Sequence, residues 1–183
     1  VAAHLFRDSA AGVPRAPGLR VLYVGGDGLR KGIGYLAQAL DLVDRADIQA
    51  RAAGNLELSE SALTLLSRRI EILGTVPRSE MPRLFAWADV LVLPSLSDTF
   101  GLVILEAMAA GLPVTASENT SAPDIVRHGV EGYVVPIRDS QAIATALDAL
   151  ASDPDRVRQM GWQARRRASE FTVSHYGVRL MQA

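Results

Sequence analysis

Residues 89–117 constrain the fold of this chain more than any other stretch, because they combine a strand, a turn, a helix and a second strand. The run Val-Leu-Val-Leu near the start of this segment, closed by Pro94, is typical of a strand buried on both faces of a sheet. After a short polar turn, apolar side chains recur at helical spacing, which predicts a helix over residues 100–110. Gly111 ends this helix before the second strand begins.

This unit places a helix N-terminus at the carboxyl end of a parallel strand, where open α/β sheets bind their ligands. Unpaired amides and the helix dipole favour an anion at that point. Two acids flank it, since Asp98 precedes the helix and Glu106 lies two turns inside it. A carboxylate near a phosphate is unfavourable unless it accepts hydrogen bonds from a neutral part of the ligand, such as sugar or ribose hydroxyls. The combination therefore predicts a phosphorylated sugar or a nucleotide as the ligand.

Composition excludes several other classes of protein. The chain has 183 residues, of which 49% are hydrophobic, which fits one folded domain and excludes a disordered chain. Nineteen basic and twenty acidic residues nearly balance, so nothing predicts nucleic-acid binding. The lack of cysteine excludes disulfides and thiolate metal sites. No apolar stretch approaches the roughly 20 residues that span a bilayer. Because the chain begins with Val1, we expect it to be a fragment, so the lack of a signal peptide proves little.

Strand and helix patterns alternate along the whole chain, which predicts an α/β fold with a doubly wound parallel sheet of about six strands and helices on both faces. The expected strands cover residues 19–24, 48–53, 70–73, 90–93 and 132–135, together with the second strand of the segment above. The expected helices cover residues 31–45, 58–68, 100–110, 122–129, 140–150 and 155–171, with one that begins at Ser79 and a last one near residues 174–181.

A glycine-rich turn, residues 25–28, follows the first expected strand. Glycines such as Gly26 let the backbone approach a diphosphate, while Lys31, and Arg30 beside it, supply positive charge. A flexible turn before a solvated basic helix start is the alternative. A basic pair at a helix N-terminus opposes the dipole, which favours an anionic partner. The spacing is not G-x-G-x-x-G and no acid clearly ends the second strand, which argues against a dinucleotide-binding dehydrogenase.

Four stretches resemble one known family: YVGGDGLRKGIGYLAQAL, ILGTVPRSEMPRLFAWADVLVLPS, SDTFGLVILEAMAAGLPV and APDIVRHGVEGYVVP. They are similar to the C-terminal, nucleotide-sugar-binding domain of the retaining glycosyltransferases with the GT-B architecture, family four (glycosyl transferases group 1). The third stretch is the specific one, because it has the acid-x₇-acid motif of that family. The resemblance implies a Rossmann-like donor-binding domain over residues 19–171, preceded by a lead-in or linker over 1–18 and followed by a helix over 172–183 that packs toward a missing N-terminal domain.

The resemblance also implies roles for individual residues. Glu106 would hold the ribose hydroxyls of the nucleotide, and Asp98 would orient the donor sugar near its anomeric centre. The diphosphate would be bound by Gly26, Arg30 and Lys31. The start of the helix would bind the donor mainly through the backbone amides of Thr99, Phe100, Gly101 and Leu102. Val76 lies in the loop that would cup the nucleobase.

Each of these roles has a plainer alternative. Asp98 is a good N-cap for the helix that follows it. Glu106 could be a solvent-facing helix residue, but its apolar neighbours predict burial, and an unpartnered buried carboxylate is costly. The loop around Val76 could be an ordinary connection. For the side chains of Phe100 and Leu102 we expect simple core packing.

Two departures from the family pattern stand out. The family usually has Glu where this chain has Asp98, and often has Arg where this chain has Gly26, although Arg30 is a candidate substitute. A non-catalytic relative and a nucleotide-sugar epimerase on the same architecture therefore remain as alternatives.

The resemblance implies that the full-length protein is a cytoplasmic enzyme that transfers a sugar from a nucleoside diphosphate to an acceptor, with retention and without a metal or other cofactor. A sugar, lipid or other small-molecule acceptor, and any peripheral membrane association, would involve the missing N-terminal domain. We expect this fragment alone to be inactive.

Overall fold

The computed structural model describes residues 18–98 and 101–171. Its centre is a six-stranded sheet in the order β3-β2-β1-β4-β5-β6, in which every neighbouring pair is parallel. The strands are β1 (Leu19–Val24), β2 (Ile48–Ala53), β3 (Glu71–Gly74), β4 (Val90–Leu93), β5 (Val114–Ser117) and β6 (Gly132–Val135). The predicted α/β fold with about six parallel strands is therefore confirmed, and β1, β2, β4 and β6 have the predicted bounds.

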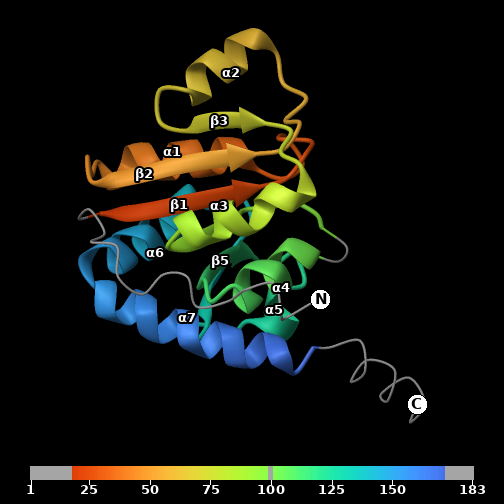
Figure 1. The fold of residues 1–183 in the computed structure, drawn as a ribbon. Coiled ribbons are helices and arrows are strands. Elements are labelled where there is room, and N and C mark those ends of the chain that lie inside the picture. The colour runs from red at the N-terminus through yellow and green to blue at the C-terminus, as the bar shows by residue number, and fades with distance from the viewer. Residues whose placement is uncertain (1–17, 99–100, 172–183) are drawn as a thin grey trace.

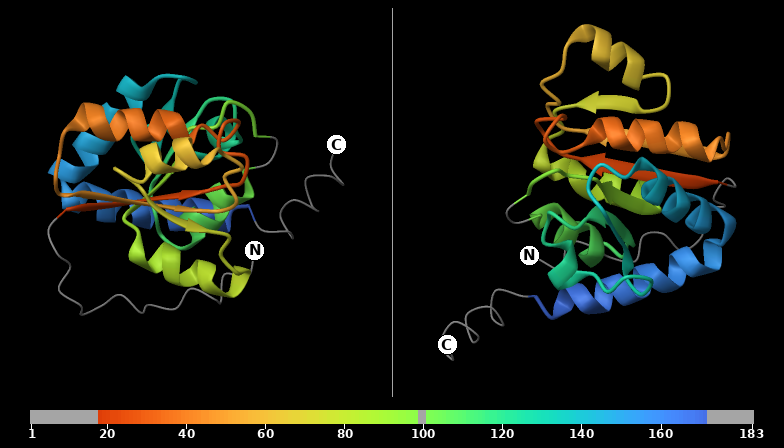
Figure 2. Two further views of the ribbon diagram at one scale, coloured as in Figure 1. Left: turned by 90° about the horizontal axis from the view of Figure 1, so that it is seen from above. Right: turned by 180° about the vertical axis from the view of Figure 1, so that it is seen from behind.

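The helices cover both faces of the sheet, as a doubly wound fold requires. They are α1 (Ile33–Val43), α2 (Glu60–Leu66), the 3₁₀ helix η2 (Arg78–Glu80), α3 (Met81–Trp87), α4 (Leu102–Ala109), α5 (Ala122–Ile125), α6 (Ser140–Ser152) and α7 (Pro154–Ser169). Helix α3 lies in front of the sheet in Figure 1, whereas α1 and α6 lie in front in the view from behind in Figure 2. None of the described helices is long and apolar enough to cross a bilayer.

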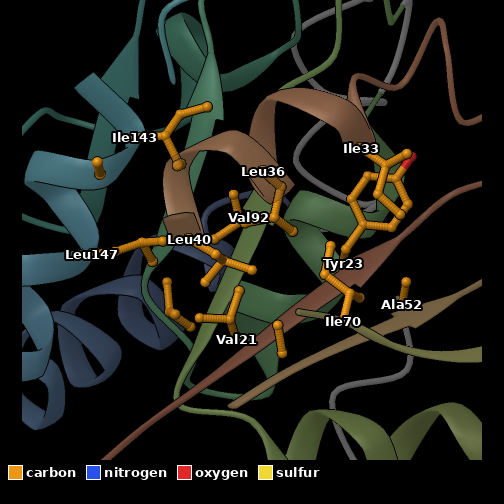
Figure 3. Close-up of a cluster of buried hydrophobic side chains, with 14 of the residues drawn as sticks. Val21, Tyr23, Ile33, Leu36, Leu40, Ala52, Ile70, Val92, Ile143 and Leu147 are labelled. Carbon is orange, nitrogen blue, oxygen red and sulfur yellow. The ribbon is translucent and has the colours of Figure 1, made fainter. Parts of the chain in front are cut away.

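Side-chain alternation along the central strands divides the core into two clusters. In β1, Val21 and Tyr23 face the cluster formed with α1 and α6, while Leu22 faces the cluster formed with α3, α4 and α7. Figure 3 shows the first cluster, where Leu36 and Leu40 of α1 lie over these strands. All four residues of β4 are fully buried, because this strand is covered on both faces.

Several predicted helix ends were wrong by a few residues. The helix predicted over residues 122–129 ends at Ile125, because Val126 is extended and the Arg127 N–H donates to the Glu131 carboxylate at 2.8 Å. The last long helix starts at Pro154, where Asp153 caps it by accepting from the Arg156 N–H at 2.9 Å. The predicted lead-in over 1–18, except for Gly18, and the predicted helix over 172–183 lie outside the described residues.

Candidate functional site

The strand order reverses between β1 and β4, which makes the carboxyl ends of these two strands the expected binding crevice of the sheet. The arrowheads of β1, β2 and β3 point to the right in Figure 1, and the segment after β4 leaves the sheet on the same side. Two loops therefore meet at this edge. One joins β1 to α1 through residues 25–32, and the other joins β4 to α4 through residues 94–101.

The β1–α1 loop ends at Gly32, which has φ 74° and approaches the β4–α4 loop closely. A Cβ atom at Gly32 would overlap the Pro94 carbonyl oxygen. The left-handed residue delays the helix, which begins at Ile33 and not at Lys31 as predicted. Arg30 and Lys31 therefore lie in a turn, and the argument that they form a basic helix start was wrong.

Lys31 and Asp98, both predicted site residues, form an ion pair between Nζ and Oδ2 across the two loops. Their side chains are only 15% and 14% exposed. The other oxygen of Asp98, Oδ1, accepts a hydrogen bond from the Gly101 N–H at 3.3 Å. Gly101 has φ 43° and precedes the first residue of α4, so Asp98 also anchors the chain just before this helix. The alternative that Asp98 is the N-cap was wrong, because Gly101 occupies that position and α4 has no side-chain cap hydrogen bond.

Arg30 also joins the two loops. Its Nε donates to Asp27 Oδ2 at 2.8 Å and its Nη1 donates to the Ser97 carbonyl oxygen at 3.0 Å, while its own carbonyl accepts from the Leu96 N–H at 2.8 Å. The hydrogen bond from the Arg30 guanidinium lowers the pKa of the Asp27 carboxyl below its usual value. Both cations of the β1–α1 loop therefore have an acidic partner from the protein.

Glu106 is less buried than its apolar neighbours predict. Its side chain is 28% exposed and its Oε1 lies 3.4 Å from Nη2 of Arg78, whose side chain is 94% exposed. The expectation that Glu106 is buried without a partner, from which a ligand was inferred, was therefore wrong. The carboxylate is instead accessible at the surface of α4, within reach of the loop that follows β3.

The remaining predicted residues fall around these groups. Gly26 is exposed, and the next two amides, of Asp27 and Gly28, donate to carbonyl oxygens of the β2–α2 loop at 3.1 and 2.8 Å. Val76 is half-buried in the β3–η2 loop. Leu102 is 58% exposed, so the expectation that its side chain packs in the core was wrong. The predicted residues Thr99 and Phe100 lie outside the described residues.

Sequence reasoning missed three residues at this edge. Arg78 gave no signal, because its partner Glu106 is 28 residues away. Tyr23 and Ser95 are buried, and their hydroxyl groups have no hydrogen-bond partner within the part of the chain that the structure describes. Burial is also the main reason that the pKa of the Tyr23 hydroxyl is raised. Among the described residues, no group of three or more His, Asp or Glu side chains is placed to hold a metal ion.

The sequence is similar to those of known glycosyltransferases. Residues 18–153 match the sequence profile of the family described as Glycosyl transferases group 1. The chain is 34% identical over 181 residues to D-inositol 3-phosphate glycosyltransferase from Nocardia farcinica, which covers 98% of this chain and 36% of that protein. It therefore spans little more than a third of the length of this curated relative.

Two solved structures have the same fold. HepE from Anabaena, in complex with UDP and glucose, superposes with a TM-score of 0.79 at 26% identity, over 91% of this chain and 48% of that one. The C-terminal domain of LpcC from Francisella tularensis, a glycosyl transferase group 1 family protein, superposes with a TM-score of 0.75 at 24% identity, over 85% of this chain and 87% of that one.

Proposed function

This chain belongs to the glycosyl transferases group 1 family, and we propose that it is the domain of such an enzyme that binds a nucleoside-diphosphate sugar. The full-length protein would transfer the sugar to an acceptor with retention, and the acceptor would be held by a part of the enzyme outside this chain. The complex of HepE with UDP and glucose supports a nucleotide-sugar donor, because this chain has the same fold over 91% of its length.

The observation that carries the proposal is the placement of Lys31 and Glu106 at the strand-order reversal. Lys31 comes from the loop after β1, and Glu106 from the helix that follows β4. An ammonium group suits the diphosphate, whereas an accessible carboxylate suits the two hydroxyls of a ribose. The first amides of α4, at Leu102 and Val103, have no acceptor within the helix, as at any helix N-terminus, and would donate to a phosphate of the donor.

These groups also fit the chemistry of glycosyl transfer. When the bond between the sugar and the diphosphate breaks, negative charge builds on the leaving diphosphate. Lys31 and the α4 amides would stabilise that charge, while Glu106 would keep the nucleoside in place. The loop around Val76 would contact the nucleobase, since it lies beside Arg78, the partner of Glu106. We propose that donor binding does not require a metal ion.

Calorimetric titration of the chain with UDP, GDP and their glucose and mannose conjugates tests the proposal. We expect selective binding of one base and about tenfold weaker binding by Glu106→Gln. A hydrogen bond to a charged group is worth about 1.5–3 kcal/mol and one to a neutral amide about 0.5–1.5 kcal/mol, and a difference of about 1.4 kcal/mol is tenfold in affinity. Glu71→Gln is the matched control, because Glu71 is also a partly exposed Glu paired with an arginine, Arg51, at 2.7 Å. Equal affinity of wild type and Glu106→Gln would contradict the ribose role. Failure of every nucleotide to bind would favour a relative that no longer uses a donor.

A further inference from the structure

The cations at the candidate site do not present free positive charge. Three ion pairs lie at this edge, and each joins one cation to one carboxylate, so that the formal charges of the six side chains cancel: Asp27 with Arg30, Asp98 with Lys31, and Glu106 with Arg78. A site that selected its ligand by charge alone would leave such cations without acidic partners. The presence of a carboxylate beside each cation therefore needs its own physical explanation.

The Lys31–Asp98 pair is the least exposed of the three. Its side chains are 15% and 14% exposed, against 50% and 44% for Arg30 and Asp27. Charges that are shielded from solvent are screened less by water and salt, so this pair acts on a ligand most strongly. The Asp98 carboxylate is also fixed in place, because its second oxygen accepts the Gly101 N–H at 3.3 Å.

We propose that Asp98 is a specificity-determining residue, which neutralises the Lys31 ammonium and thereby favours the nucleoside-diphosphate sugar over the more highly charged nucleoside diphosphate released by transfer. This inference rests on the proposed function.

The physical basis is the charge difference between the two ligands. In the donor, both phosphates are esterified and each carries one negative charge. In the released nucleoside diphosphate, the terminal phosphate ionises a second time with a pKa near about 6, which adds one negative charge at neutral pH. An unpaired ammonium would therefore bind the product more tightly than the donor. A carboxylate beside the ammonium repels each ligand in proportion to its charge, and so disfavours the product more.

The test is calorimetric titration of the full chain with the nucleoside diphosphate that the wild type binds and with its sugar conjugate. Asp98→Asn keeps the side-chain oxygen that accepts the Gly101 N–H but removes the charge. We expect about fivefold tighter binding of the nucleoside diphosphate and about threefold tighter binding of the sugar conjugate, since the two ligands carry roughly three and two negative charges. Asp27→Asn should shift both affinities in the same direction by less, because the Asp27–Arg30 pair is more exposed.

A remote ion pair provides the matched control. Arg45 Nη1 lies 3.1 Å from Asp148 Oδ1, and Arg45 lies between α1 and the start of β2, far from the carboxyl ends of the strands. Asp148→Asn should therefore leave both affinities unchanged. Asp98→Ser is a second variant if Asp98→Asn does not fold, as judged by circular dichroism. It removes the same negative charge and keeps an oxygen that can accept a hydrogen bond, so it should also tighten binding of the nucleoside diphosphate more than binding of the sugar conjugate.

Two results would overturn the inference while leaving the proposed function intact. If Asp98→Asn weakens only the sugar conjugate, Asp98 contacts the sugar directly. If it changes neither affinity, the carboxylate does not act on the ligand. A wild-type chain that binds no nucleotide at all would refute the proposed function, and this inference with it.

Discussion

Replacing Gly32 by alanine tests whether the close approach of the two loops sets up the site. Gly32 has φ 74°, and left-handed backbone costs a residue with a Cβ about 1–2 kcal/mol. The new Cβ would also overlap the Pro94 carbonyl oxygen and lie 2.9 Å from the carbonyl carbon. Overpacking of this kind costs a further 1–3 kcal/mol, roughly, when the neighbour is backbone that cannot rotate away. We therefore expect Gly32→Ala to lower the free energy of unfolding by about 3 kcal/mol.

Gly34 offers a matched control two residues along the chain. It is exposed on α1, and a Cβ there would meet no atom within 4 Å. Alanine is favoured over glycine in helices, so Gly34→Ala should raise the free energy of unfolding by up to about 1 kcal/mol.

Urea unfolding, followed by circular dichroism, measures both changes. Because Gly32 adjoins Lys31, the folded fraction of Gly32→Ala should also bind the nucleotide more weakly than Gly34→Ala does. Wild-type stability in Gly32→Ala would refute the argument, since the β1–α1 loop would then move away from Pro94 at no cost. Loss of stability with unchanged affinity would show that Lys31 finds its position without this contact.

Two further predictions concern side chains at the same edge. Tyr23→Phe removes a buried hydroxyl that has no partner among the described residues, so the free energy of unfolding should stay within about 0.5 kcal/mol of wild type or rise. A loss of more than about 1 kcal/mol at pH 7 would mean that the hydroxyl is hydrogen-bonded. Burial raises the pKa of Tyr23 above the usual value of about 10, so the unfolded state loses this proton first as the pH rises. The free energy of unfolding should therefore fall above about pH 10, and Tyr23→Phe should reduce that fall. Arg78→Ala should change stability by less than about 0.5 kcal/mol in urea unfolding, since its guanidinium is 94% exposed and 3.4 Å from Glu106; a larger loss would show that this pair supports the fold.

The strands could be predicted from the sequence because burial on both faces leaves a local pattern. Residues 90–93 were predicted with the bounds that β4 has, and all four of these residues are buried. The parallel direction of the strands also follows from the alternation of strands and helices, which requires crossover connections, whereas their order in the sheet was not predicted.

The starts of α1 and α4 could not be predicted in the same way. Each helix begins after a glycine in the left-handed conformation, Gly32 or Gly101, and neither glycine interrupts the apolar spacing on which the prediction depended. What fixes these conformations is contact between loops that are distant in the sequence, such as the approach of Gly32 to Pro94. Such contacts leave no periodic signal.

The partners of the charged residues were beyond sequence reasoning for a similar reason. Lys31 and Asp98 were both singled out, but they are 67 residues apart and nothing in the sequence indicates that they pair. The exposure of Glu106 was also misjudged, because apolar neighbours on a short helix do not fix which way one side chain points.

This pairing changes the physical argument for the ligand. Basic residues at a helix start would demand an anion because the helix dipole opposes them, but Arg30 and Lys31 precede the helix and already have carboxylate partners. The site therefore does not need an anion to offset its charge, and a phosphate must be held by directed hydrogen bonds from the ammonium and from the first amides of α4. Recognition by geometry with little net charge would suit the proposed function, in which a charged donor is bound and a product that carries more charge is released.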